Sequence, residues 1–162
     1  MKIILRFLLG FVLIEKTAYA HCDIPCGIYD PYLVQRAAHT IIRMTQLLTE
    51  IKPEDDLKSD HSIARITKVK EDHSNILEEE LETLRNDYFK EEHFKEYPKL
   101  NDLFVQVLKS SAKARQNIDM TSAQETLAKV QEIAEIFFKT KNVLPIRVKT
   151  VYPTGGEIVL HK

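Results

Sequence analysis

A histidine and both cysteines of the chain lie within the six residues from His21 to Cys26. His21 directly follows Ala18-Tyr19-Ala20, a small-residue pattern typical of a signal-peptidase site. If cleavage follows Ala20, His21 becomes the N-terminus of the mature chain. This segment then offers a free α-amine, an imidazole, a backbone amide and the thiolates of Cys22 and Cys26, which together form a nitrogen-and-sulfur chelator.

The spacing of these donors indicates which metal they suit. The α-amine and the Cys22 amide nitrogen can close a five-membered chelate ring, and the Cys22 thiolate adds a second ring. Cys26 can return to the same metal because Pro25 and Gly27 help the backbone to turn, and the His21 imidazole can reach an axial position. A deprotonated amide favours nickel or copper over zinc. Amide and thiolate donors also stabilise a higher oxidation state, so that Ni(III)/Ni(II) cycling becomes accessible.

The two thiols also allow other uses. A Cys22–Cys26 disulfide is an alternative in an exported protein. Such a small ring at a chain end restricts the unfolded chain little, and it would therefore add little stability. A thiol oxidoreductase is less favoured, because three residues separate the cysteines here and two are usual.

Residues 1–20 have the pattern of a cleaved secretory leader. Lys2 and Arg6 precede an apolar stretch over residues 7–14, and the small-residue cleavage site Ala18-Tyr19-Ala20 follows it. The apolar stretch is too short to span a bilayer, so we expect no stable membrane anchor. A processing protease must remove the leader, and the protein is then periplasmic, lumenal or extracellular. If the leader is only a maturation peptide, the protein is cytoplasmic.

Charge and length limit the other function classes. The 162 residues include 23 Lys and Arg and 24 Asp and Glu; without residues 1–20, 20 basic and 23 acidic side chains remain, a net charge of −3 with histidine neutral. No basic run supplies the face that a nucleic-acid-binding protein needs, so we expect no nucleic-acid partner. The length fits one domain with its own core.

Four amphipathic helices are predicted within residues 32–141. The first begins at Asp30-Pro31, a cap followed by proline, and a polar loop to Asp60 leads to the second. The third runs from about Pro98 to Gln116, and the fourth begins at a capping box on Thr121 or Ser122. Short links between such helices favour an antiparallel four-helix bundle, so the predicted fold class is all-α. The apolar stripes are Val34, Ala37, Ala38, Ile41, Met44, Leu48 and Ile51; Ile63, Ile66, Val69, Ile76, Leu77, Leu81 and Leu84; Leu100, Leu103, Phe104, Val107 and Leu108; and Leu127, Val130, Ile133, Ala134, Phe137 and Phe138.

Two further segments differ from the helices. Residues 87–98 are the densest aromatic patch and end in a proline, which predicts a structured connection. The C-terminal extension, residues 142–162, has two β-type runs around Pro153-Thr154-Gly155-Gly156, which predicts a β-hairpin. An isolated hairpin is marginal in water, so we expect it to pack on the bundle or on a neighbouring subunit.

The N-terminal motif resembles that of a known family. The run His21-Cys22-Asp23-x-Pro25-Cys26-Gly27-x-Tyr29-Asp30-Pro31 is similar to the nickel hook of the nickel-containing superoxide dismutases. The stretch Asp87-Tyr88-Phe89-Lys90, with His93-Phe94 and Tyr97-Pro98, resembles a second block of that family. The resemblance extends from His21 to about Lys141, so the C-terminal extension lies outside it.

The resemblance implies a nickel superoxide dismutase that converts superoxide to dioxygen and hydrogen peroxide. It implies a homohexamer of four-helix bundles, with the hook at residues 21–31 and one nickel ion per subunit. His21, Cys22 and Cys26 would be the metal ligands. Tyr29 and Tyr88 match tyrosines near the open face of the metal, where they would order water and admit only small anions.

The sequence departs from some family members behind the metal ligands. Those members orient the histidine ring with a Glu and an Arg, and the matching positions here hold Ala37 and His73. We interpret His73 as structural, since a single histidine in a helical stripe usually completes the packing. The remaining histidines show no paired ligand spacing and are predicted to be surface or loop residues: His39, His61, His93 and His161.

A second function class stays open from the residues alone. An exported helical bundle could use the same hook to sequester nickel or copper without catalysis. Sequestration requires neither Tyr88 beside the hook nor a fixed hexamer. Catalytic turnover, as opposed to stoichiometric metal uptake, separates the two functions.

Overall fold

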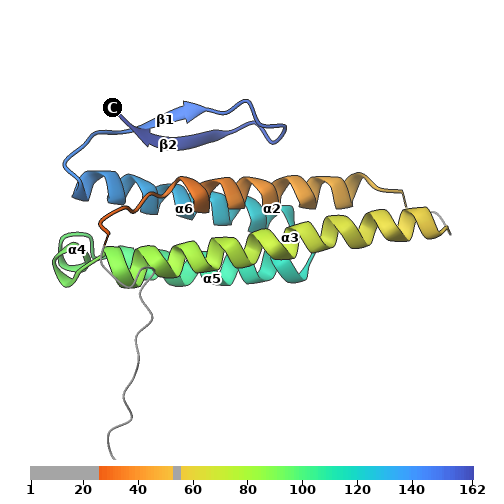
Figure 1. Ribbon diagram of the computed structural model, residues 1–162, viewed down its shortest axis with the longest axis horizontal. Helices are drawn as coiled ribbons and strands as arrows, with labels where there is room; N and C mark the ends of the chain where they lie inside the picture. Colours follow the sequence, from red (N-terminus) through yellow and green to blue (C-terminus); the bar gives the residue numbers. More distant parts are fainter. Residues whose placement is uncertain (1–25, 53–55) are drawn as a thin grey trace, which may run out of the picture.

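The computed structural model describes residues 26–52 and 56–162. Its long helices are α2 (Tyr32–Glu50), α3 (Leu57–Thr83), α5 (Leu100–Gln116) and α6 (Met120–Thr140). A π-helical turn, η1 (Leu84–Tyr88), and the short helix α4 (Glu91–Glu96) connect α3 to α5 (Figure 1). Two strands, β1 (Pro145–Lys149) and β2 (Glu157–His161), follow α6. The predicted class, a helical bundle with a small C-terminal hairpin, is confirmed. The leader over residues 1–20 lies outside the described residues.

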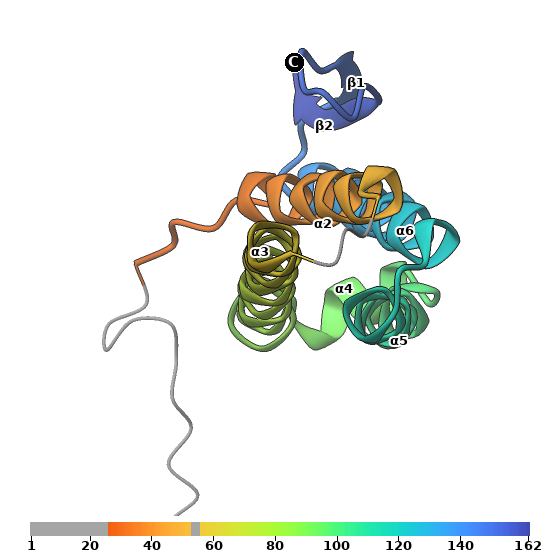
Figure 2. The ribbon, with the colours of Figure 1, turned by 90° about the vertical axis from the view of Figure 1, so that its right-hand side faces the viewer.

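The four long helices surround one apolar core. Seen along the bundle, α2 and α6 form the layer next to the hairpin, and α3 and α5 form the layer beneath it (Figure 2). Most of the predicted stripe residues are buried, as the periodicity requires for helices that face a shared core. The largest fully buried apolar side chains are Phe104, Ile41, Leu77, Leu81, Leu84, Leu100, Ile133, Val34, Val107, Val130 and Val159.

Side-chain caps explain where two helices begin. Asp56 accepts a hydrogen bond from the Ser59 amide, so α3 begins at Leu57, earlier than the predicted loop to Asp60 allows. Asp119 accepts from the amide of Ser122 at 3.0 Å and from its hydroxyl at 2.8 Å, so α6 begins at Met120. The predicted capping boxes on Thr121 and Ser122 are therefore wrong. The Asp119 carboxylate, which the sequence places in the helix break, is the cap itself.

The aromatic connection is ordered by ring packing. Phe89 follows η1 and is buried, with its ring 5.7 Å from that of Phe104 and 6.2 Å from that of Phe94. A π-helical turn replaces regular α-helix just before it, and the chain then enters α4. The prediction of a structured connection is confirmed, with a short helix inside it that the pattern did not reveal.

The predicted hairpin is confirmed as two antiparallel strands. Pro145 pairs with His161 at one end and Lys149 with Glu157 at the other. Gly155 and Gly156 in the connection have φ angles of 62° and 77°, which favour glycine because a Cβ atom is strained there. At Gly156 a Cβ would also lie 3.4 Å from His39 Cε1, so glycine allows the connection to approach α2 closely.

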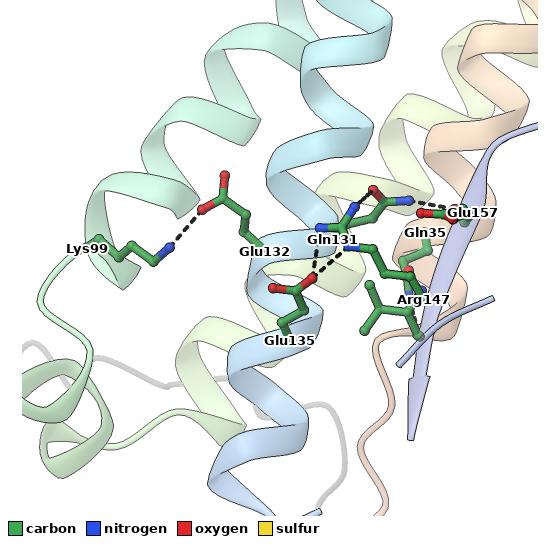
Figure 3. A network of polar contacts seen from close by, with 8 residues as sticks. Gln35, Lys99, Gln131, Glu132, Glu135, Arg147 and Glu157 are labelled. Carbon is green, nitrogen blue, oxygen red and sulfur yellow. Dashed lines mark hydrogen bonds and ion pairs between the residues drawn. The ribbon is translucent and has the colours of Figure 1, made fainter. Parts of the chain in front are cut away.

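Hydrogen bonds from α2 and α6 hold the hairpin on the bundle. Gln35 is fully buried; its Nε2 donates to the carbonyl of Val159 at 3.0 Å, and its Oε1 accepts from the Val159 amide at 2.7 Å. Gln131 donates to the carbonyl of Glu157 and accepts from Arg147 at 3.0 Å (Figure 3). Arg147 also pairs with Glu135 at 2.8 Å. The expectation that the hairpin packs on the bundle is met within one chain.

His39 corrects one sequence-based prediction. It is buried, with 4% of its surface exposed, although its spacing predicted a surface or loop residue. Its Nε2 donates to the Glu157 carbonyl at 3.1 Å, so Nδ1 of the neutral ring accepts from the Thr154 hydroxyl at 2.9 Å. The docked hairpin covers this ring.

One predicted stripe is only partly covered. Ile63 and Ile66 are half-buried, and Val69 is 36% exposed. They lie in the first half of α3, and in Figure 1 α2 and α3 extend at one end beyond α5 and α6. The apolar side chains there have fewer helices to pack against. In the part of the chain that the structure describes, no helix is both long and apolar enough to cross a membrane.

Candidate metal centre

Tyr29 and Tyr88 meet at the end of the bundle where α2 begins and α6 ends. Their ring centroids are 5.6 Å apart, with the ring planes tilted by 51°. Tyr29 comes from the segment that leads into α2, and Tyr88 is the last residue of η1. Asp30 helps to fix this segment, since its carboxylate accepts from the Tyr32 amide at the start of α2. The structure therefore brings together the two tyrosines that the sequence selected.

The hydroxyl of Tyr88 donates its proton to the side chain of Thr140. Thr140 donates its only hydroxyl proton to the Phe137 carbonyl at 2.7 Å. Tyr88 lies 2.6 Å from the Thr140 oxygen and must therefore be the donor of that bond. Burial raises the pKa of Tyr88. Tyr88 is thus a neutral phenol whose oxygen still has lone pairs to accept a hydrogen bond.

A cation and an imidazole flank the Tyr88 ring. The Lys141 ammonium lies 4.7 Å from the ring centroid, in the geometry of a cation–π contact. The His93 ring is nearly parallel to that of Tyr88, at 5.7 Å and 16°. His93 Nδ1 accepts from the Lys90 amide at 3.0 Å, and the proton of the neutral ring is therefore on Nε2. His93 was predicted to be a surface or loop residue, and the structure places it half-buried beside the tyrosine pair.

Cys26 is the predicted ligand that the structure describes. Its side chain is exposed, and its sulfur accepts from the Ile28 amide at 3.4 Å. Gly27 between them has a φ angle of +71°, the turn that the motif predicted at this glycine. An exposed cysteine at this position can serve as a metal ligand, since its sulfur is not enclosed by the bundle.

His21 and Cys22, the other predicted ligands, lie outside the described residues. Within residues 26–52 and 56–162, no group of three or more His, Cys, Asp or Glu side chains is arranged to hold a metal ion. The predicted metal site therefore depends on donors from the segment that precedes Cys26. Their assignment remains a prediction from the motif.

The structure describes both residues that depart from the family pattern, Ala37 and His73. Ala37 is buried in α2 with 1% of its surface exposed. His73 is half-buried, and its Nδ1 donates to the Val69 carbonyl one turn earlier in α3 at 2.9 Å. This bond commits the His73 ring to its own helix, which agrees with the structural interpretation.

The fold and the site define a class: a four-helix bundle in which Tyr29, three residues after Cys26 in the sequence, contacts Tyr88 at the end of η1, the π-helical turn after α3. Comparison with known proteins gives the family. The profile described as nickel-containing superoxide dismutase matches residues 16–141. The chain belongs to this family.

Individual relatives agree with the family match. The chain is 34% identical over 122 residues to "Superoxide dismutase [Ni]" of Streptomyces seoulensis, covering 75% of this chain and 88% of that protein. It is 33% identical over 127 residues to the protein of the same name from Streptomyces coelicolor, covering 78% and 92%.

Solved structures show the same fold. A native nickel superoxide dismutase structure has a TM-score of 0.66 at 31% identity, covering 75% of this chain and 99% of that chain. A structure with the nickel ligation of the oxidised state has a TM-score of 0.67 at 32% identity, with the same coverage. Almost the whole of each solved chain matches, whereas residues 142–162 lie beyond the family match.

Proposed function

We propose that the protein is a nickel superoxide dismutase whose metal is bound at a mature N-terminus created by cleavage after Ala20. The observation that carries this proposal is the contact between Tyr88 and Tyr29, which follows Cys26 by three residues in the sequence. These tyrosines come from two separate sequence blocks that both resemble the family. A protein that only sequesters metal has no need of this arrangement.

The residues fit nickel by donor type. His21 supplies an amine and an imidazole, Cys22 an amide nitrogen and a thiolate, and Cys26 a second thiolate. Soft thiolate with strong nitrogen donors suits nickel or copper, and the family and its named relatives select nickel. When bound, nickel supplies one-electron Ni(III)/Ni(II) redox chemistry, which takes an electron from one superoxide and returns it to another with two protons.

The chain's own residues contribute exclusion, orientation and charge. Tyr29 and Tyr88 restrict the approach to Cys26 to small molecules. The Tyr88 oxygen directs its proton to Thr140 and therefore keeps lone pairs that can accept a hydrogen bond from a water molecule. The Lys141 ammonium above the Tyr88 ring adds positive potential where an anion approaches, which favours superoxide over neutral molecules.

Assembly and processing are further parts of the proposal. We propose a homohexamer with one nickel ion per subunit and export by the cleaved leader. The partly covered apolar stripe on α3, with Val69 36% exposed, supports association between copies. Export is supported by the leader pattern of residues 1–20 alone.

Native mass spectrometry of protein purified from its own host tests the proposal. Mature chains that begin at His21, one nickel ion each and six chains per particle are expected. Superoxide turnover by the same sample, at one active site per nickel, completes the test. Stoichiometric nickel or copper uptake without turnover would instead support sequestration. A Cys22–Cys26 disulfide without metal would contradict both functions.

A further inference from the structure

A cavity of about 200 Å³ lies between α2 and the connection of the hairpin. On the α2 side it is lined by Arg36, Thr40 and Arg43, which follow one another at helical spacing on one face. Tyr152 and Thr154 of the connection line the opposite side. The cavity shares no lining residue with the Tyr29–Tyr88 site, and part of its wall comes from the extension beyond the family match.

The cavity is lined by two arginines, Arg36 and Arg43, whose positive charges have no acidic partner among the described residues. Neither Arg36 nor Arg43 forms an ion pair with an acidic side chain of residues 26–52 or 56–162. Arg43 donates to the neutral amide oxygen of Gln46 at 3.4 Å. The hydrogen bond with Tyr32, with burial, raises the pKa of Tyr152, so its hydroxyl does not supply a negative charge to Arg36.

The remaining walls are mainly carbon. Met44 extends the α2 side beyond Arg43, and Pro153 lies between Tyr152 and Thr154 on the other side. The volume is below the roughly 300–1,000 Å³ typical of sites for drug-sized ligands, so only a smaller molecule fits. Two guanidinium groups with carbon walls suit a molecule that has one anionic group and a short apolar body.

We propose that this cavity binds a small organic monocarboxylate. The carboxylate pairs with Arg36 and Arg43, because the planar guanidinium matches carboxylate geometry with two parallel hydrogen bonds. The apolar body contacts Met44 and the Tyr152 ring. This binding site is separate from the metal centre, and the proposal does not rest on the proposed function.

Such a ligand would link two parts of the fold. It contacts α2 and the hairpin connection together, and the connection is otherwise held there by His39 and the Tyr152–Tyr32 hydroxyl contact at 3.1 Å. A ligand that binds only the docked hairpin stabilises the folded chain by mass action. The melting temperature should therefore rise with ligand concentration.

Isothermal titration of the metal-free full chain with benzoate tests the proposal. Benzyl alcohol, which has the same ring without the charge, and inorganic phosphate, which has charge without an apolar body, are the matched probes. We expect benzoate to bind at least about tenfold more tightly than either, because hydrogen bonds between charged groups are the stronger ones. Equal binding of benzyl alcohol would show that the carboxylate does not contribute to binding, and it would overturn the proposal. Tighter binding of phosphate would overturn the ligand class.

Arginine variants locate the binding. Arg36→Gln and Arg43→Gln should each weaken benzoate binding about tenfold, with Arg43→Lys retaining part of the affinity. Arg85→Gln, at an exposed arginine of η1 that does not line the cavity, is the control and should bind as the wild type does. Unchanged binding in both cavity variants, or equal loss in the control, would contradict the site.

A filling variant covers the case in which an arginine variant fails to fold. Thr40→Phe leaves both arginines in place and occupies the cavity from α2. It should abolish benzoate binding while circular dichroism shows unchanged helix content. Full affinity in a folded Thr40→Phe protein would show that benzoate binds elsewhere, and the proposal would fail.

Discussion

The tyrosine end of the bundle and the face covered by the hairpin use polar groups in opposite ways. At the hairpin, Gln35 and His39 are buried, and every hydrogen-bonding group of each side chain has a backbone or hydroxyl partner. At the tyrosine end, the Cys26 thiol is exposed and a cation lies above the Tyr88 ring. Satisfied buried polar groups fix a docking geometry, whereas exposed donors beside ordered aromatic rings can still react with a substrate.

The two regions also differ in whether the family match includes them. The family match ends at residue 141, so it includes the tyrosine end and excludes the hairpin. The hairpin docks on α2 and α6, and neither Tyr29 nor Tyr88 contacts it through a ring pair. An extension can thus be added to one face of the bundle while the end that carries the chemistry keeps its geometry. Substitutions in the two regions should accordingly separate activity from stability.

The largest expected effect is on activity at the tyrosine end. Cys26→Ser replaces the proposed thiolate ligand and should lower superoxide turnover by roughly 100-fold or more, since changes behind the metal ligands alone cost 10–100-fold. The melting temperature of the metal-free chain should not change, because the Cys26 side chain is exposed. Pulse radiolysis with nickel analysis measures the first effect and calorimetry the second. Normal turnover in this variant would remove Cys26 from the metal site.

The next effect is on stability at the hairpin. Gln35→Leu leaves the Val159 amide and carbonyl without their side-chain partner, and each unsatisfied buried group costs about 1–3 kcal/mol. We expect the free energy of unfolding in urea to fall by about 2–4 kcal/mol. Turnover per bound nickel should be unchanged. Gln106→Leu on the exposed face of α5 is the matched control. A fall in turnover per bound nickel in the folded Gln35→Leu protein would mean that the hairpin and the metal site are coupled.

A smaller effect is expected at Tyr88, which packs against other rings of the bundle and also belongs to the proposed metal site. Tyr88→Phe keeps the ring contacts and removes the hydrogen bond to Thr140, which is worth about 0.5–1.5 kcal/mol of stability. If Tyr88 controls access to the metal, as proposed, the substitution should also lower turnover, with the larger change in KM. Tyr97→Phe, at the other end of α4, serves as the control. Identical kinetics in the two variants would assign Tyr88 to packing alone.

The smallest effect is the pH dependence of hairpin docking. Burial lowers the pKa of His39, and the hydrogen bond with Glu157 opposes the shift only in part. The unfolded chain therefore binds a proton that the folded chain excludes, and stability falls as the pH decreases below the unfolded value of about 6.5. Urea unfolding at several pH values should show this slope. His39→Gln should reduce it, whereas His61→Gln on the exposed surface of α3 should leave it unchanged. An equal slope in both variants would assign it to other groups.

Helical periodicity predicted most of the bundle. The stripes of α2, α5 and α6 point into the core because apolar residues at helical spacing share one face. The same rule overestimated burial in α3, where Ile63 and Ile66 lack a second layer of helices. Caps near Asp56 and Asp119 were misjudged because an acidic residue in a polar run reads equally well as loop or cap.

The sequence predicted only those residues of the candidate site that lie in its two family-like blocks. Tyr29 and Tyr88 were selected from two blocks, and their contact confirms that the blocks are neighbours in space. Thr140, Lys141 and His93 were missed because they reach Tyr88 from other helices, which periodicity does not place. Gln35 and His39 did leave a signal: two polar residues four apart beside an apolar stripe indicate a second packing partner on that face of α2.

The N-terminal position of His21 is the central claim, and a single added residue tests it most directly. The mature chain beginning at His21 and a chain with one extra alanine before it should be prepared identically and loaded with nickel. The account predicts superoxide turnover in the first and its loss in the second, because acylation removes the α-amine as a ligand. Full turnover in the extended chain would show that the metal site does not require a free His21 amine and would contradict the account.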